Sequence, residues 1–358
     1  MEKKTLKLNL DEKILFKSSK YKNRIKEKVN IIILLIIINI ISFHFSLIKN
    51  FWINYSFFNP ENQIIKPYII AQKDFCENFN KYKNEKYEKE LILTKAKINE
   101  LNFQIYIFKA PGFLIGTFRS EGAYETKISI NIIEALKFYS LKKKIINNKD
   151  VFMIDIGTNI GWYPSLLGRY GYSILCFEAF EKNYYVAKKN YCYLNKESNV
   201  IIITKGLGSR KKKCQYFIHL NNAGNGMVKC NNNDTEKYES FIKDSEVETT
   251  TLNTFMPYLS NKNIALMKID IEGNELEALL GGKELITKYH VPFIVLEFTP
   301  KFLNEAGSDP KQLLKFLVDN GYKISVKGFL SKKFINIDEL LRRTRFHINC
   351  YFIHDSVI

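Results

Sequence analysis

The sequence predicts an α/β fold with a mostly parallel sheet covered by helices on both faces. Two observations predict it. Short, nearly continuous apolar stretches recur along the second half of the 358-residue chain. Segments with helical spacing alternate with them. Apolar strands that alternate with helices are typical of parallel sheets that are buried on both faces.

The expected elements follow from this alternation. Strands are expected at residues 101–108, 151–157, 173–180, 199–208, 264–273 and 292–300, with a closing strand pair at 322–328 and 347–354. Helices are expected at residues 126–139, 160–170, 183–193, 275–288 and 311–320. The polar segment 221–246 has no apolar pattern, and we interpret it as a mobile lid or a wall for the acceptor.

The net charge is +17, and part of it is concentrated at the N-terminus. Residues 1–30 carry ten basic and four acidic side chains, a basic tail before the first apolar segment. Residues 101–358 show neither an aromatic RNA-binding motif nor a basic helix, so no nucleic-acid partner is expected. An apolar content of 46% excludes a chain that is disordered throughout.

A transmembrane signal-anchor helix is expected over residues 31–48. This stretch has no Lys, Arg, Asp or Glu. Its eighteen residues would form about 27 Å of helix, close to the thickness of a bilayer core. The alternative is a buried core helix, which the absence of a polar face disfavours. The stretch is also too long for a cleaved signal peptide, and no small-residue cleavage site follows it.

The basic tail sets the orientation, because positive flanks stay in the cytosol. We therefore expect a single-pass type II membrane protein of the secretory pathway (ER or Golgi) with a lumenal catalytic domain. The acceptor sequons at Asn54 and Asn233 fit a lumenal face. Residues 49–100 are charged with little apolar periodicity and are expected to form a stem. The folded domain is expected over 101–358, with its core at 151–300.

A candidate nucleotide site lies where the first of the buried strands ends. The sequence Asp-Ile-Gly-Thr-Asn-Ile-Gly begins at Asp155, closes that strand and opens a helix. Glu178 ends the next strand, where a doubly wound fold places an acid against ribose hydroxyls. The sequence lacks the G-x-G-x-x-G pattern that binds a pyrophosphate. A carboxylate at Asp155 instead suits a cationic ligand without phosphate, such as S-adenosylmethionine (SAM).

This site and a second motif resemble the FkbM family of SAM-dependent methyltransferases. The second motif is Lys-Ile-Asp-Ile-Glu-Gly-Asn-Glu, which starts at Lys268 and is followed by Leu-Gly-Gly at 280–282. The resemblance also extends to the Leu-Glu-Phe that contains Glu297. Two positions depart from the family pattern: Asn253 stands where an acid is common, and Ala179 stands where Pro is usual.

The resemblance implies a Rossmann-like class I methyltransferase fold, with a seven-stranded sheet whose last strand is antiparallel. It implies SAM as the cofactor and O-methylation, often of sugars or sugar-bearing metabolites. The residues that it implies for cofactor binding are Asp155, Gly157, Asn159, Gly161, Glu178, Gly208 and Asp270.

Transfer of a methyl group to a hydroxyl needs alignment and a base within hydrogen-bond reach. Asp270 is the candidate base; the alternative is that it only contacts the SAM amine or supports the structure. Glu272 and Glu297 are further catalytic candidates, although Glu272 and its neighbour Glu275 could instead cap a helix. Lys268 either orients the substrate or forms a structural ion pair. Three carboxylates would also suit a divalent metal, which the sequence does not show.

Other conspicuous side chains have simpler interpretations. The histidines at 219, 290, 347 and 354 are expected in the core or on the surface. Cys176 and Cys350 are expected to be buried thiols. Six cysteines do not make a disulfide scaffold, although Cys214 and Cys230 flank the polar segment and could bridge in a lumen. Trp162 and Tyr163 could pack either on substrate or in the core.

The leading hypothesis is a membrane-anchored O-methyltransferase for a sugar, glycan or glycoconjugate. A second is a cytosol-facing methyltransferase for a lipid or small metabolite. A third is an inactive SAM-binding interaction protein, against which the joint presence of Asp155, Gly157, Glu178 and Asp270 argues. RNA methylation is the fourth, and the missing RNA-binding features disfavour it.

Overall fold

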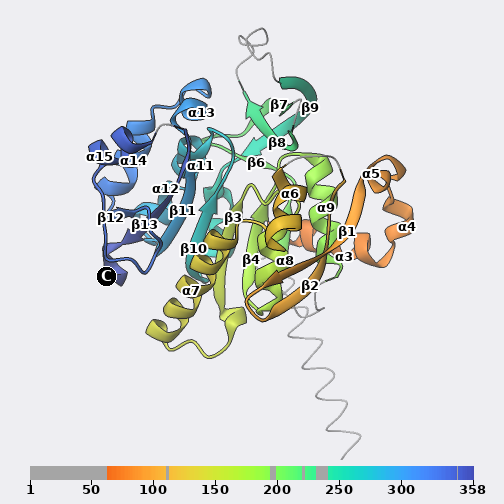
Figure 1. Cartoon of the computed structure of the whole chain (residues 1–358), viewed down its shortest axis with the longest axis horizontal. Helices are drawn as coiled ribbons and strands as arrows, with labels where there is room; N and C mark the ends of the chain where they lie inside the picture. The colour runs from red at the N-terminus through yellow and green to blue at the C-terminus, as the bar shows by residue number, and fades with distance from the viewer. Residues whose placement is uncertain (1–62, 110–112, 194–198, 220–221, 231–240, 345) are drawn as a thin grey trace, which may run out of the picture. The chain divides into compact units, whose positions relative to one another are not determined.

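Seven strands form the central sheet of the computed structural model, in the order β12-β13-β11-β10-β3-β4-β5 (Figure 1). Neighbouring strands from β11 to β5 pair in parallel, whereas β13 runs antiparallel to both β11 and β12. The sheet is therefore mixed rather than mostly parallel. The strands are β3 (Val151–Ile156), β4 (Ser173–Phe177), β5 (Val200–Ile203), β10 (Asn263–Ile269), β11 (Phe293–Phe298), β12 (Tyr322–Ser325) and β13 (Ile348–His354).

The structure describes residues 63–109, 113–193, 199–219, 222–230, 241–344 and 346–358. The predicted basic tail (1–30) and signal-anchor helix (31–48) lie outside these residues, as do both sequons. Within the described part of the chain, no helix combines the length and the apolarity that crossing a membrane would need.

The two faces of the sheet bury alternate residues of each strand, because successive side chains of a strand point to opposite sides. On β3, Met153 belongs to the hydrophobic core on one face and Ile154 to the core on the other. The first face is covered by α7 (Thr126–Lys143), α8 (Trp162–Arg169) and α9 (Glu181–Tyr191). The other is covered by α11 (Glu275–Gly281), α12 (Lys283–Thr287) and α14 (Pro310–Asp319).

Two predicted elements are divided in the structure. The helix expected over 275–288 breaks at Gly282, between α11 and α12. The strand expected over 199–208 becomes β5 and the separate β6 (Gly206–Leu207). Shorter helices connect these elements. They are α6 (Phe113–Glu121), α10 (Met256–Leu259), α13 (Pro300–Glu305), α15 (Ile337–Arg343) and the 3₁₀ helices η1 (Asn148–Asp150), η2 (Leu252–Phe255) and η3 (Asp355–Val357).

The polar segment predicted as a lid or acceptor wall contains strands. β7 (Lys212–His219), β8 (Asn222–Lys229) and β9 (Phe241–Thr250) join β6 in a second sheet of order β6-β9-β7-β8 (Figure 1). A disulfide joins Cys214 on β7 to Cys230 just after β8. The segment 221–246, in which the sequence showed no apolar pattern, thus contains β8 and the first part of β9, while residues 231–240 lie outside the described part. Its role as a lid or a wall for the acceptor stays a prediction.

Residues from Ile64 onward belong to one compact unit that reaches Ile358, so the predicted stem is folded from residue 64 onward. It contains α3 (Lys66–Glu77), α4 (Phe79–Tyr82), α5 (Glu85–Lys89) and β1 (Leu91–Ile98), which pairs with β2 (Leu101–Phe108). Phe75 on α3 is 2% exposed. A disulfide joins Cys76 to Cys192 at the end of α9. The low apolar periodicity of this segment hid its contribution to the core.

Candidate active site

A cavity of about 810 Å³ opens where β3, β4, β10 and β11 end, and we call it the main cavity. Parallel strands bring their carboxyl ends to one edge of the sheet, where ligands of such folds bind. Six of the predicted site residues line it, and one of the six is a glycine. They are Gly157, Asn159, Glu178, Asp270, Glu272 and Glu297.

The turn after β3 forms one wall of the main cavity. Gly157 has φ +82°, and its amide donates a hydrogen bond to the carbonyl of Phe177 (2.9 Å). A Cβ at this position would lie 1.9 Å from the carbonyl oxygen of Asp270. Only glycine therefore fits between the ends of β3 and β10.

Asp155 and Gly161 lie behind this wall rather than on it. Asp155 is fully buried, and its Oδ2 accepts a hydrogen bond from Thr158 Oγ1 (2.5 Å). Burial raises the pKa of Asp155. At Gly161 a Cβ would lie 3.1 Å from Cα of Ala187, so this glycine serves the packing of α8 against α9. Neither residue lines the main cavity, and their contact with a cofactor stays a prediction.

Glu178 follows the end of β4 and faces the main cavity. Its Oε2 accepts a hydrogen bond from the amide of Asn159 (2.7 Å), and its Oε1 accepts one from the amide of Phe180 (2.9 Å). Burial raises the pKa of Glu178 to about 7, although these two hydrogen bonds act in the opposite direction. The carboxylate is held rigidly and keeps lone pairs for hydroxyl donors.

Asp270, Glu272 and Glu297 meet in the main cavity, as the motif predicted. Burial raises the pKa of Glu272 well above its usual range, and the charges of Asp270 and Glu297 raise it further. Burial and the charge of Asp270 raise the pKa of Glu297 to about 8. Such a group exchanges its proton near neutral pH, the range that suits acid–base catalysis.

Lys268 forms an ion pair with Asp270, one of these three carboxylates. Its side chain is 6% exposed, and its Nζ lies 3.0 Å from Oδ2 of Asp270. Burial acts to lower the pKa of Lys268, but the charges of Asp270, Glu125 and Asp155 outweigh it and raise the pKa. Of the two predicted roles, the structure favours the structural ion pair, with Asp270 as the partner.

Glu125 is a site residue that the sequence did not reveal. It precedes α7 with φ +46°, lines the main cavity and accepts a hydrogen bond from Tyr163 Oη through Oε2 (2.5 Å). Burial raises the pKa of Glu125, against the opposing charge of Lys268. Tyr163 also lies under Lys268, with its ring centroid 5.1 Å from Nζ. Tyr163 thus holds Glu125 toward the lysine.

Three further placements bear on the predictions. Glu275 caps the turn before α11, because its Oε1 accepts hydrogen bonds from the amides of Ile271 (3.3 Å) and Gly273 (3.1 Å). His347 lines the main cavity, with Nε2 4.0 Å from Oε1 of Glu297. Gly208, predicted to contact the cofactor, lines a neighbouring pocket instead.

Within the described residues, no group of three or more His, Cys, Asp or Glu could hold a metal ion.

Comparison with known families gives one match, which covers part of the chain. Residues 155–324 match a family described as the methyltransferase FkbM domain. The matched segment begins at Asp155 and includes the Lys268–Glu275 motif and Glu297. The match supports a methyltransferase family for this segment. Comparison with curated proteins finds no relative.

Several solved structures resemble the chain at low identity. The bifunctional kinase-methyltransferase WbdD shares 11% identity, with a TM-score of 0.39, over 69% of this chain and 44% of that chain. Magnesium protoporphyrin IX methyltransferase (ChlM) from Synechocystis PCC 6803, in a structure with bound SAM, shares 12% identity. Its TM-score is 0.32, over 68% of this chain and 95% of that chain. This chain therefore covers less than half the length of the WbdD protein.

Proposed function

We propose that this protein is a SAM-dependent O-methyltransferase that acts on a hydroxyl of a sugar, glycan or glycoconjugate. One observation carries the proposal. Gly157, Glu178 and Asp270 come from three strand ends and line one cavity, inside the segment that matches the methyltransferase FkbM domain. Each has a residue type and a strand position that this chemistry needs.

The main cavity fits the proposed cofactor in three ways. Its volume of about 810 Å³ lies within the usual range for small-molecule sites. The absence of a Cβ at Gly157 lets the end of β10, with Asp270, lie against the turn after β3, so both border the same cavity. Glu178 presents a fixed carboxylate for ribose hydroxyls, and the carboxylates of the main cavity suit a cationic ligand.

Asp270 is the proposed base. When bound, SAM supplies an electrophilic methyl group on a sulfonium centre. Lys268 holds one carboxylate oxygen of Asp270 at 3.0 Å, so the other oxygen can take the proton of an acceptor hydroxyl. A positioned base of this kind contributes about 10²- to 10⁴-fold to the rate.

Glu297 and Glu272 are proposed to orient the acceptor. With a pKa of about 8, Glu297 carries a proton at neutral pH and can donate a hydrogen bond to a sugar oxygen. Glu272 has its pKa raised in the same direction. Fixed hydrogen bonds on both sides of the reacting hydroxyl would reduce the entropy that is lost on reaching the transition state.

The proposed location is the lumen of the secretory pathway, with residues 31–48 as the membrane anchor. The two disulfides, Cys76–Cys192 and Cys214–Cys230, support an oxidising compartment. Cys176 and Cys350 stay reduced and buried, as predicted. A carbohydrate acceptor is in keeping with this location.

The test is calorimetric titration of SAM into the full chain in detergent micelles. We expect Glu178→Ala to weaken binding at least tenfold, because the ribose hydroxyls lose their carboxylate. We expect Asp270→Asn to retain binding but to lose methyl transfer to a panel of glycans by about 10²-fold or more.

Glu284→Gln is the matched control, since Glu284 is a carboxylate whose ion pair with Lys288 is exposed. It should bind SAM like the wild type. A well-folded wild-type chain that does not bind SAM would exclude the methyltransferase function. Binding without transfer to any glycan would exclude the carbohydrate acceptor and favour a lipid or small metabolite.

A further inference from the structure

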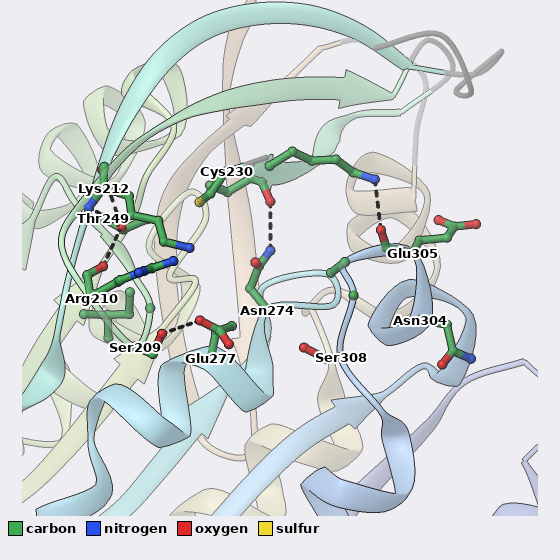
Figure 2. A pocket seen from close by; sticks show the side chains of 16 residues that line it. Ser209, Arg210, Lys212, Cys230, Thr249, Asn274, Glu277, Asn304, Glu305 and Ser308 are labelled. Carbon is green, nitrogen blue, oxygen red and sulfur yellow. Dashed lines mark hydrogen bonds between the residues drawn. The ribbon is translucent and has the colours of Figure 1, made fainter. Parts of the chain in front are cut away.

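A second pocket of about 500 Å³ adjoins the main cavity, and we call it the side pocket (Figure 2). The turn between β6 and β7, the ends of β8 and β9, the start of α11 and the segment after α13 line it. Leu207, Val228 and Asn274 line both cavities. These residues form the wall between the two.

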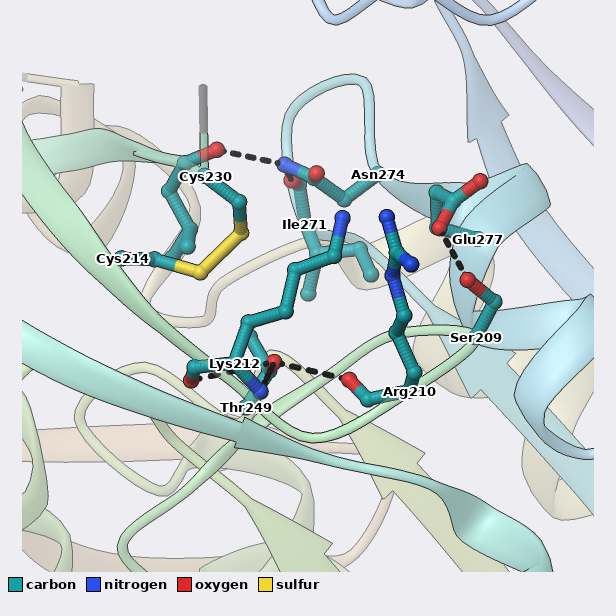
Figure 3. The surroundings of a disulfide bond; sticks show 10 residues. Ser209, Arg210, Lys212, Cys214, Cys230, Thr249, Ile271, Asn274 and Glu277 are labelled. Carbon is teal, nitrogen blue, oxygen red and sulfur yellow. Dashed lines mark hydrogen bonds between the residues drawn. A yellow bond between two sulfur atoms is a disulfide. The ribbon is translucent and has the colours of Figure 1, made fainter. Parts of the chain in front are cut away.

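Two cations converge in the side pocket. The guanidinium of Arg210 and the ammonium of Lys212 lie side by side in both close views, with their charged ends directed toward Asn274 (Figures 2 and 3). Neither has an acidic partner within 4.0 Å among the described residues, whereas Lys213 next in the chain pairs with Glu246. Like charges that meet without an anion favour an anionic ligand.

The backbone of the turn that carries these cations is held by its neighbours. Thr249 is buried, and its hydroxyl donates a hydrogen bond to the carbonyl of Arg210 (3.1 Å) and accepts one from the amide of Lys212 (3.1 Å). Beneath the turn, a Cβ at Gly281 would lie 2.0 Å from the carbonyl oxygen of Gly208. The two cations therefore stand on a preorganised support, which reduces the entropy cost of binding.

The carboxylates that line the side pocket are already engaged. Glu277 accepts a hydrogen bond from Ser209 Oγ through Oε2 (2.5 Å), as Figure 3 shows. Glu305 pairs with Lys301 through Oε1 (3.8 Å). Lys229, a third cation of the pocket, donates to the backbone carbonyl of Glu305 (3.4 Å). Neither acid forms an ion pair with Arg210 or Lys212.

The wall between the cavities lies close to the proposed base in the sequence. Asn274 donates a hydrogen bond from Nδ2 to the carbonyl of Val228 (3.0 Å), which joins the end of β8 to the start of α11. Asn274 follows Asp270 by four residues, a separation of at most about 14 Å along the backbone. Asn274, which lines the side pocket, therefore lies within about 14 Å of the proposed base.

We propose that the side pocket binds an anionic group of the acceptor, a phosphate, sulfate or carboxylate, on Arg210 and Lys212. The cations of the side pocket attract such a group, so they fix which end of the acceptor meets Asp270. This inference rests on the proposed function for the identity of the acceptor, but the anion site itself is testable without it.

The test titrates inorganic phosphate, inorganic sulfate and glucuronate into the full chain by calorimetry, at constant ionic strength set with chloride. The variants are Arg210→Gln/Lys212→Gln and, as a matched control, Lys211→Gln/Lys213→Gln. Both double variants remove two positive charges from the same turn, but Lys211 and Lys213 lie outside the lining of the pocket. Methyl glucoside serves as the neutral probe.

We expect saturable binding of at least one anion, weakened tenfold or more by Arg210→Gln/Lys212→Gln and less than twofold by the control. The preferred anion identifies the group on the acceptor, and methyl glucoside alone should not occupy the site. Absence of saturable anion binding, or equal weakening by both double variants, overturns the proposal.

SAM titrations on the same samples separate this proposal from the proposed function. Retained SAM binding in Arg210→Gln/Lys212→Gln supports a site distinct from that of the cofactor, and its loss overturns that distinction. If the wild type binds an anion but not SAM, the proposed function is wrong. The side pocket is then an anion site, but not a site for the acceptor of a methyl group.

Discussion

At the scale of single residues, one buried lysine, Lys268, provides a positive charge among the carboxylates of the candidate site. Lys268 is almost fully buried and lies among Asp270, Glu125 and Asp155, all of which raise its pKa. Its Nζ makes an ion pair with Asp270 alone of these three, at 3.0 Å. An ammonium in this position lets several carboxylates share a small volume.

We expect Lys268→Met to lower the free energy of unfolding by about 3–5 kcal/mol at pH 8, because buried carboxylates lose their counter-charge. The loss should be smaller at pH 5, where the carboxylates can take up protons and become neutral. Urea unfolding at the two pH values measures both effects. Lys288→Met, which breaks an exposed pair with Glu284, should cost less than about 1 kcal/mol. A loss that does not change with pH would contradict this explanation.

The raised pKa values predict how ligand binding depends on pH. Burial lifts the pKa of Glu178 to about 7 and that of Glu297 to about 8, from an ordinary value of 4.5. Because these values are raised, both groups destabilise the empty fold progressively as the pH rises from about 4.5 to 8. Over pH 6 to 9 they ionise, and the main cavity becomes more negative.

We therefore expect the preference for SAM over S-adenosylhomocysteine to rise about fivefold between pH 6 and 9. Only SAM carries the sulfonium charge, while the amine that titrates in this range is common to both ligands. Calorimetry with the two ligands at each pH gives the ratio. Glu297→Gln should flatten the rise, and a preference that is constant with pH in the wild type would refute it.

The sequence predicted those site residues that stand at strand ends. Asp270, Glu272 and Glu297 were predictable because buried parallel strands deliver their ends to one edge. Glu125 was not, because it lies before α7, and only the packing of Tyr163 brings it to the main cavity. Cys76 and Cys192 are 116 residues apart, and no spacing rule connects them.

At the scale of elements, the turn between β3 and α8 depends on the fit of one glycine. Gly157 and Gly171 share φ +82°, but a Cβ at Gly171 would meet only Asn148 Cβ at 3.7 Å, an ordinary contact. At Gly157 it would meet the backbone of Asp270 at 1.9 Å. Substitutions at Gly157 and Gly171 therefore separate two contributions to the free energy of unfolding: the left-handed backbone conformation, which both share, and the close approach of Asp270, which only Gly157 has.

We expect Gly171→Ala to cost about 1–2 kcal/mol, the price of a left-handed conformation for a residue with a Cβ. Gly157→Ala should cost about 3 kcal/mol or more, because β10 must also move away. It should also abolish SAM binding, while Gly171→Ala retains it. Thermal unfolding and calorimetry measure the two effects, and equal destabilisation by both variants would show that the end of β10 yields easily.

Strands buried on both faces were predictable, and the strands β7, β8 and β9 of the smaller sheet were not. The strands expected at 151–157, 264–273 and 292–300 correspond to β3, β10 and β11, because continuous apolar runs mark their burial. β7, β8 and β9 form a smaller sheet with a partly exposed face, so polar residues interrupt their apolar pattern. α4 and α5 contain no buried residue and gave no signal.

At the scale of the whole molecule, residues 64–100 complete the folded unit. α3 lies on β5, the edge strand of the seven-stranded sheet. Gln72 is buried, donates a hydrogen bond from Nε2 to the carbonyl of Val200 (2.9 Å) and accepts one from the amide of Ile202 through Oε1 (3.0 Å). The side-chain amide thus occupies the place of a neighbouring strand and covers an edge that would otherwise pair with another chain.

Two truncations and one substitution test this boundary. A fragment that begins at Ile64 retains α3 and both disulfides, so we expect it to be monomeric and to unfold cooperatively. A fragment that begins at Leu101 loses Cys76 and exposes β5, so we expect it to aggregate. Gln72→Ala in the longer fragment should cost about 2–4 kcal/mol, because two backbone groups of β5 lose their partner. Light scattering and urea unfolding report these outcomes. A monomeric, cooperative fragment from Leu101 would return residues 64–100 to the role of a stem, and the folded unit would then begin at β2.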